Sequence, residues 1–406
     1  MKNIRLCVYR SLASCRKNIT AAIDFLPAWG ILYPERGCAI TMLKYFSVSG
    51  YKNFDQLIEL DFSDVRDYKY STSCISNGLL GKMVIYGKNA VGKSNFARAL
   101  YDMIYLVQKP SDNLMRNDHY LSVNSKKGFA EFRYVFQFDD DIVEYIYRKT
   151  APLELIYEKI SVNNELLIEF DRKNPQDFQA PGLTKLSPTL VLNFENVSAV
   201  LTYIVSNTPL DTDHPLQRAI EFISAMFMDA PGESIDAKSD YSLGFITPEK
   251  EYVERFGQLL KTAGVTESLV VIEDPTGKPA LFFNTNPPLP FNYTASSGTK
   301  ILTTLFMLFN VMSRRTKPCL LILDEFDVYY HYELAERIVK MLLSLPNVQV
   351  IFTTHNTSLL TNRLLRPDCC FIMTKNKLTA FSNATKMELR EGHNLEKLFI
   401  GGEFDE

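Results

Sequence analysis

The sequence predicts an α/β protein with a mainly parallel core sheet and flanking helices. Short apolar runs of strand length alternate with segments of helical periodicity along much of the chain. A glycine-rich stretch stands directly between one such strand and one such helix. Two aromatic runs flank an acidic turn, which predicts an antiparallel β-hairpin subdomain beside the main sheet.

The first half of the chain holds the predicted antiparallel structure. A helix is expected over residues 94–107, where apolar residues recur at helical spacing. Asp139, Asp140 and Asp141 separate the aromatic runs FAEFRYVFQF and IVEYIYRK. A solvated hairpin turn is the favoured interpretation of this triplet, and a metal or nuclease site is the alternative. Strands are expected at 43–48, 56–62, 82–86, 157–162 and 166–170.

The second half begins with a small helical lobe near residues 206–265. Its best helices are 215–228 and 248–263, with Thr247 as a helix cap and Pro248 at the first helical position. Strands and helices then alternate, as in a parallel sheet. Strands are expected at 269–272, 280–283, 319–326, 348–355 and 370–374, and helices after Ser297 and at 333–345 and 357–365.

Composition limits the class of protein. The chain has 406 residues and a formal net charge of −3, so a uniformly basic nucleic-acid-binding surface is not indicated. The seven cysteines form no CxxC pair, which favours free thiols in a reducing cytosol over a zinc site. No apolar run reaches the roughly 18 residues that span a bilayer. These features predict a cytoplasmic protein without a membrane partner.

Residues 87–94, GKNAVGKS, match the phosphate-binding pattern GxxxxGK[ST] at every fixed position. Backbone N–H groups at a helix N-terminus favour an anion. Lys93 is expected to reach the β- and γ-phosphates, and the Ser94 hydroxyl to bind Mg²⁺. A chance glycine-rich turn is the alternative. The predicted ATP-binding residues here are Gly87, Lys88, Asn89, Ala90, Val91, Gly92, Lys93, Ser94 and Asn95.

An acidic pair follows the apolar run LLIL. Asp324 and Glu325 stand at the carboxyl end of this predicted strand, where sheets of this class bind ligands. Asp324 is expected to hold the magnesium shell, and Glu325 to act as general base on the attacking water. The alternative makes Asp324 a helix cap and Glu325 a surface charge.

Three further stretches resemble one family. ASSGT at 295–299 resembles a divergent form of the signature motif of ABC-type ATPases. His355 ends TTH, where those proteins carry a switch histidine, and VSGYKNF at 48–54 resembles the N-terminal motif of the SMC/RecF branch. The chain thus resembles a stand-alone SMC-like ABC ATPase of the abortive-infection and overcoming-lysogenization-defect-like group, also described as AAA ATPases, without a Toprim nuclease domain. The segment GHNLEKLFIGGEF at 392–404 adds to this resemblance.

The resemblance implies a P-loop NTPase fold of the ABC-ATPase head type. It also implies a head-to-tail homodimer, or a higher oligomer, with ATP between the phosphate loop of one copy and the signature of the other. Ser296 and Gly298 would then contact the γ-phosphate, and His355 would contact it or position water. Lys52 would reach the nucleotide, and Asp327 would contact the second copy. The alternatives are that Ser296 caps a helix, that His355 is a buried hydrogen-bonded histidine, and that Lys52 is a solvated surface lysine.

Four segments follow from these motifs. Residues 1–41 are basic and lack sustained periodicity. They are predicted to be a dispensable extension, disordered or translated from an upstream start codon, with a targeting or docking tail as the alternative. The remaining segments are an N-terminal ATPase lobe at 42–205, a helical lobe with connecting strands at 206–294, and a C-terminal ATPase lobe at 295–406.

The predicted function is an ATP-hydrolysing switch that dimerises around Mg-ATP and controls a separate effector protein in anti-phage defence. A RecF- or SMC-like ATPase in DNA repair, with DNA as partner, is the first alternative. The second is a scaffold that binds ATP without hydrolysing it. The signature departs from LSGGQ, and no glutamine suits a magnesium-sensing loop, because Gln137 falls inside a hairpin strand.

Overall fold

The computed structural model describes residues 41–108, 119–188, 190, 199–230, 250–273, 277, 279–375 and 377–404. These residues belong to two compact units. The larger unit contains residues 41–230 and 315–404, and the smaller unit contains residues 250–314. The predicted extension at 1–41 lies outside the described residues except for Thr41.

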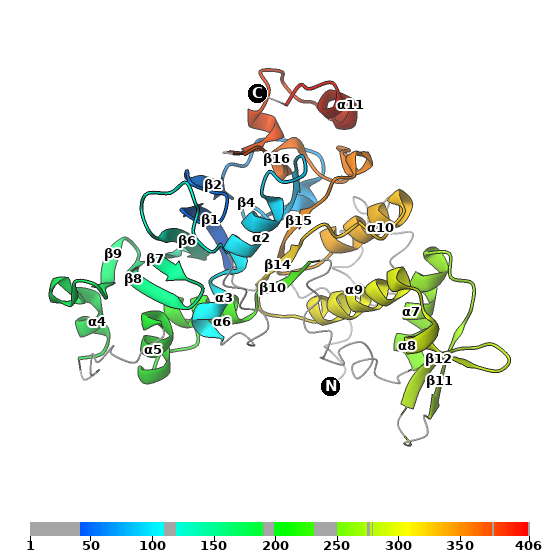
Figure 1. The fold of residues 1–406 in the computed structure, drawn as a ribbon, viewed down its shortest axis with the longest axis horizontal. Helices are drawn as coiled ribbons and strands as arrows, with labels where there is room; N and C mark the ends of the chain where they lie inside the picture. The colour runs from blue at the N-terminus through cyan, green and yellow to red at the C-terminus, as the bar shows by residue number, and fades with distance from the viewer. Residues whose placement is uncertain are drawn as a thin grey trace, which may run out of the picture. The chain divides into compact units, whose positions relative to one another are not determined.

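A six-stranded sheet in the order β10-β14-β15-β5-β16-β17 forms the centre of the larger unit (Figure 1). All neighbouring strands pair in parallel except β16 and β17. Every residue of β5, β14, β15 and β16 is buried, which explains why apolar residues make up most of each strand. The predicted mainly parallel α/β class is therefore confirmed. The strands are β5 (Lys82–Tyr86), β10 (Phe227–Asp229), β14 (Cys319–Leu323), β15 (Val348–Thr353), β16 (Cys370–Met373) and β17 (Leu378–Ala380).

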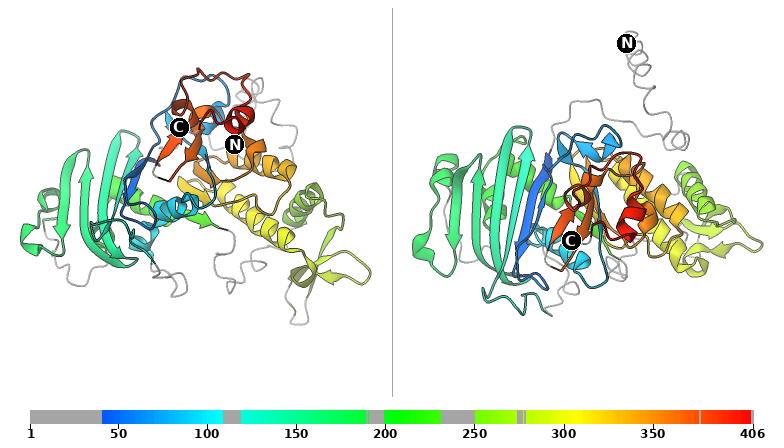
Figure 2. Two further views of the ribbon diagram at one scale, coloured as in Figure 1. Left: turned by 45° about the horizontal axis from the view of Figure 1, so that its top comes forward. Right: turned by 90° about the horizontal axis from the view of Figure 1, so that it is seen from above.

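The second large sheet is antiparallel, in the order β2-β1-β6-β7-β8-β9 (Figure 2). Phe138 of β6 pairs with Asp141 of β7, so the predicted hairpin around the acidic turn is confirmed. Gln349 of β15 bonds the backbone of Leu43 in β1 and of Leu80, which ties the two sheets together. The strands are β1 (Thr41–Ser49), β2 (Ile58–Asp61), β6 (Ala130–Phe138), β7 (Asp141–Ala151), β8 (Glu154–Val162) and β9 (Glu165–Asp171). A separate two-stranded ribbon contains β3 (Ile75–Ser76) and β4 (Leu79–Leu80).

The helices of the larger unit correct two predictions. The helix predicted over 94–107 is two helices, and the Tyr134 hydroxyl, which donates to the carbonyl of Ala99 at 2.8 Å, lies also 3.2 Å from that of Leu100 near the break. The helix predicted over 215–228 ends at Ser224, because the following residues pair with β14 as β10. The helices are α2 (Lys93–Tyr101), α3 (Ile104–Val107), α4 (Pro181–Leu186), α5 (Val200–Asn207), α6 (Pro215–Ser224), α10 (Tyr332–Leu343) and α11 (Leu395–Ile400).

The helix predicted over 357–365 is also wrong. Only a single 3-10 turn forms there, η5 (Thr357–Leu359). The side chain of Asn362 bonds the carbonyls of Arg390, Glu391 and His393. These contacts fasten the chain to its C-terminal segment.

The smaller unit packs three helices with an antiparallel sheet in the order β11-β12-β13. Its core is aromatic: Phe256 contacts Phe291 and Phe306, and Phe283 contacts Phe291. The predicted cap at Thr247 and Pro248 lies outside the described residues. The elements are α7 (Lys250–Thr262), β11 (Leu269–Glu273), β12 (Pro279–Phe283), β13 (Leu289–Pro290), α8 (Phe291–Thr294) and α9 (Ser297–Ser313).

Across the described parts of both units, no helix combines the length and apolar character needed to cross a membrane.

Candidate functional site

The glycine-rich loop leaves the carboxyl end of β5 and ends where α2 begins. A Cβ on Gly87 would lie 2.6 Å from the carbonyl oxygen of Met373, and a Cβ on Gly92 would lie 2.5 Å from Asn53 Nδ2. Gly92 also has a φ of 115°, which glycine adopts without strain. Close packing therefore requires both glycines, and backbone conformation requires the second.

Lys93 folds back over this loop from the first turn of α2. Its ammonium donates to the carbonyls of Gly87 at 2.9 Å and Lys88 at 3.2 Å. Burial lowers the pKa of Lys93, and the charges of Glu325 and Asp324 oppose that shift. The two carboxylates therefore lie near enough to act on the lysine, although they come from a distant part of the sequence.

Asn53 secures the loop from a different segment. Its Nδ2 donates to the carbonyl of Val91 at 3.1 Å, and its Oδ1 accepts from Asn95 Nδ2 at 2.7 Å. Lys52, the residue predicted to act here, places its ammonium 5.6 Å from the centre of the Tyr51 ring. Sequence reasoning singled out the right stretch, 48–54, but missed the asparagine. The sequence carried no signal for this contact, because Asn53 and Val91 are 38 residues apart.

Asp324 and Glu325 follow β14 at the same edge of the sheet. Asp324 is buried, and its N–H donates to the carbonyl of Asp229 at the end of β10. Thr353 of β15 joins the two acidic residues. Its hydroxyl lies 2.6 Å from Asp324 Oδ1 and accepts the N–H of Glu325 at 2.8 Å. Sequence reasoning did not identify Thr353.

His355 brings the loop and the acidic pair together. Its Nε2 lies 2.9 Å from Lys93 Nζ and 3.6 Å from Glu325 Oε1. A lysine ammonium only donates, so Nε2 is the acceptor in the shorter contact. Three residues predicted from separate motifs thus converge on one point. His355 and Glu325 are 40% and 37% exposed, so solvent reaches this point.

Thr354, the residue before His355, binds a third acidic side chain, that of Asp327. Thr354 donates its hydroxyl to Asp327 Oδ2 at 2.6 Å and accepts the N–H of Asn356. Burial raises the pKa of Asp327. Among the described residues, Asp327 is therefore a hydrogen-bond partner of Thr354 in the same chain.

The chemistry of the loop and acidic residues fits a magnesium ion. Mg²⁺ prefers oxygen ligands, which a hydroxyl and a carboxylate supply. Ser94 is half-buried in the first turn of α2. Thr353 bonds only Oδ1 of Asp324, so Oδ2 is left for an ion. Ser94 and Asp324 are the residues that would hold it.

The SSGT segment (residues 296–299) lies in the smaller unit, at the start of α9. Ser296 caps this helix, because its Oγ accepts the N–H of Thr299 at 3.2 Å and contacts the Thr299 hydroxyl at 2.8 Å. The alternative prediction, that Ser296 caps a helix, is therefore confirmed. Ser296 and Ser297 are nevertheless exposed and Gly298 is half-buried, so the segment is accessible.

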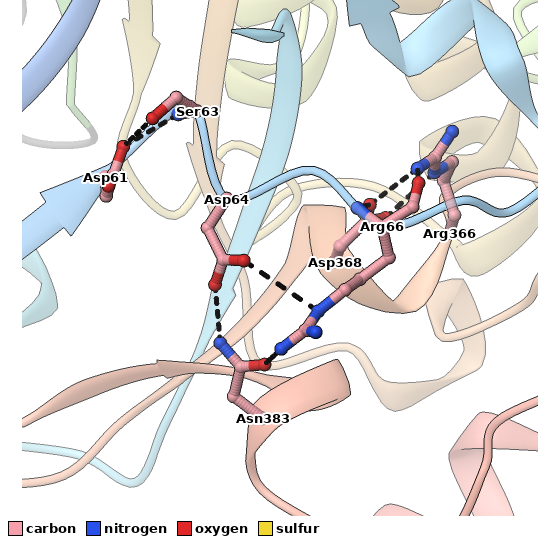
Figure 3. A network of polar contacts seen from close by, with 7 residues as sticks. All are labelled: Asp61, Ser63, Asp64, Arg66, Arg366, Asp368 and Asn383. Carbon is pink, nitrogen blue, oxygen red and sulfur yellow. Dashed lines mark hydrogen bonds and ion pairs between the residues drawn. The ribbon is translucent and has the colours of Figure 1, made fainter. Parts of the chain in front are cut away.

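A polar network that the sequence did not reveal fixes the chain ahead of β16 (Figure 3). Arg366 binds both carboxylate oxygens of Asp368, at 2.9 and 2.6 Å, and both side chains are buried. Asp368 also accepts the N–H of Arg66 at 2.8 Å, and Asn383 bridges Arg66 and Asp64. The network anchors the chain that leads into β16, the strand that pairs with β5.

Comparisons with known proteins agree with the motifs. Residues 82–361, more than half of the chain, match the family described as "AAA domain, putative AbiEii toxin, Type IV TA system". No curated protein matches the chain.

Two solved structures are similar at a distance. The SmcHead bound to the C-winged helix domain of ScpA has a TM-score of 0.45 and 16% identity, over 83% of this chain and 97% of that one. The SMC head domain from Thermotoga maritima has a TM-score of 0.39 and 16% identity, over 86% and 99%. The family match, which spans the phosphate loop, the acidic pair and the switch histidine, places this chain in the AAA domain family that it names.

Proposed function

We propose that this protein binds Mg-ATP and hydrolyses it to ADP and phosphate. The convergence of Lys93 and Glu325 on His355 is the observation that carries the proposal. These residues lie at the carboxyl edge of a parallel sheet, where α/β proteins bind ligands. Membership of an AAA domain family supports the same activity.

The roles of the residues follow from their chemistry. The loop N–H groups and Lys93 bind the phosphates, releasing the lysine from its carbonyl and histidine partners. The Glu325 carboxylate accepts a proton from the attacking water as oxygen bonds to the γ-phosphorus and ADP leaves. His355 Nε2 orients the γ-phosphate or that water. Ser94 and Asp324 would hold a Mg²⁺ ion, which would neutralise negative charge on the phosphates.

We further propose that two copies close head to tail around ATP. The exposed SSGT segment supports this arrangement, because backbone N–H groups at the start of a 17-residue helix attract an anion. Hydrolysis removes the γ-phosphate that both copies contact, so the dimer becomes a switch. The family description names a putative AbiEii toxin of a Type IV TA system. We propose that this switch controls a separate effector in phage defence.

A phosphate-release assay on two variants tests the ATPase. Lys93→Ala should lose ATP binding and turnover. Glu325→Gln should bind ATP, lose turnover by on the order of 10²-fold or more, and accumulate as a dimer on light scattering. Turnover that survives Lys93→Ala would refute the assigned loop. Wild-type protein that binds ATP without releasing phosphate would establish the scaffold alternative.

A further inference from the structure

Thr353 lies on β15, the strand between the one that leads to the acidic pair and the one that leads to the phosphate loop. β15 pairs with β14, which carries the acidic pair, and with β5, which carries the phosphate loop. Leu323 and Phe352 are register partners, so Asp324 and Thr353 come next on each strand. Thr353 is fully buried. Its position between the two motifs therefore follows from the sheet.

The two hydrogen bonds of Thr353 define the direction of each donor. A hydroxyl has one hydrogen to donate and two lone pairs to accept with. The N–H of Glu325 only donates, so it occupies a lone pair of Thr353 Oγ1 at 2.8 Å. The hydroxyl hydrogen then points to Asp324 Oδ1, 2.6 Å away. One hydroxyl thus orients one carboxylate and fixes the backbone of the next residue.

Glu325 needs such a restraint. Its φ is 47°, a left-handed conformation that costs a non-glycine residue on the order of 1 kcal/mol. The bond from its N–H to Thr353 stabilises this conformation, in which Glu325 Oε1 lies 3.6 Å from His355 Nε2. Without the bond the residue would relax toward ordinary backbone angles, and its carboxylate would leave the histidine.

We infer that Thr353 is a positioning residue for ATP hydrolysis, whose hydroxyl acts by aiming the Glu325 carboxylate. This inference rests on the proposed function. Thr353 is fully buried and bonds Glu325 and Asp324, so we assign it a positioning role. It acts through Glu325, so its loss should slow the chemical step and leave ATP binding nearly unchanged.

Single-turnover hydrolysis and binding of a fluorescent ATP analogue test the inference on the full chain. Thr353→Val removes the hydroxyl at similar volume and should lower the rate at least about tenfold, with affinity within about threefold. Thr353→Ser keeps the hydroxyl and should stay within about threefold of wild type. Thr208→Val is the matched control, because the buried Thr208 hydroxyl has no hydrogen-bond partner among the described residues.

A double variant separates positioning from general damage. If Thr353 acts through Glu325, then Thr353→Val combined with Glu325→Gln should hydrolyse ATP at the rate of Glu325→Gln alone. A further loss would overturn the inference, as would an unchanged rate in Thr353→Val or failure of Thr353→Ser. If Thr353→Val does not fold, Thr353→Ser and Thr353→Ala give the same comparison. Absence of hydrolysis by wild type would overturn the proposed function itself.

Discussion

Among single residues, Lys82 is buried in an unusual way. It opens β5 and is 5% exposed, and its ammonium donates to the carbonyls of Leu345, at 3.0 Å, and Val348. Both acceptors are neutral carbonyls, so burial lowers the pKa of Lys82 from 10.5 to about 8, and Cys74 and Cys319 oppose the shift only in part. Burial of the charged Lys82 side chain at the start of β5 therefore lowers the free energy of unfolding at neutral pH.

The pH dependence of stability tests this cost. Below pH 8 both states hold the proton, and the penalty is constant. Between about pH 8 and 10.5 the unfolded chain holds more protons than the folded chain, so the unfolding free energy rises with pH. The rise approaches about 3 kcal/mol. Urea unfolding of wild type and Lys82→Met at several pH values should show the wild-type free energy of unfolding rising by this amount relative to that of the variant. Parallel curves would contradict the prediction.

From the sequence, the residues proposed to act on the phosphates were predicted better than the residues that position them. Lys93, Glu325 and His355 belong to motifs whose residue types follow directly from phosphate chemistry, and the structure brings these three together. Asn53 and Thr353 act only through hydrogen bonds to segments about 40 and 30 residues away. Such pairings depend on sheet order, which no local pattern contains.

At the scale of elements, strands were predicted more reliably than short helices. The fully buried strands read as uninterrupted apolar runs, and the hairpin as alternating aromatics. The helix predicted over 215–228 was too long, because periodicity could not reveal that Phe227–Asp229 pairs with β14. The prediction at 357–365 failed because Asn362 bonds distant carbonyls. Tertiary contacts decided each of these outcomes.

The contact between α2 and β7 leads to a prediction at this scale. Asp102, at the end of α2, accepts from Lys149 of β7 at 2.6 Å and from the hydroxyls of Tyr120 and Tyr147. Lys149 and Asp102 are 1% and 3% exposed. Lys149→Met leaves a buried carboxylate without its counter-charge, so it should destabilise the protein by about 3–5 kcal/mol. Urea unfolding measures the loss.

A partly exposed pair in the same sheet supplies the control. Lys159 lies 3.6 Å from Glu169, and both side chains are about one third exposed, so Lys159→Met should cost about 1 kcal/mol or less. Asp102→Asn combined with Lys149→Met should recover part of the loss, because no net charge remains buried. Equal costs for Lys149→Met and Lys159→Met would contradict the assignment.

For the whole molecule, the proposed head-to-tail dimer predicts complementation between two inactive variants. Lys93→Ala disables the phosphate loop. Ser296→Asp keeps a capping side chain at α9 and places a negative charge against the triphosphate. A mixed dimer then has one site with both intact parts. Equal mixing should restore about a quarter of wild-type phosphate release, since half the dimers are mixed.

The controls are each variant measured alone at the same total concentration. If the mixture releases no more phosphate than the two variants measured separately, ATP is not shared between copies in the way proposed. The ATPase assignment would stand in that case, because it depends on Lys93 and Glu325 of one chain.

The order Thr353, Thr354, His355 has a consequence for tolerance to insertions and deletions. These consecutive residues have three different partners, Asp324, Asp327 and Lys93. Side chains of an extended segment alternate between faces, so a one-residue shift exchanges the faces. A single-codon deletion within β15 would therefore separate all three partnerships at once, whereas deletion of the exposed Asp140 would fall in a hairpin turn outside the site.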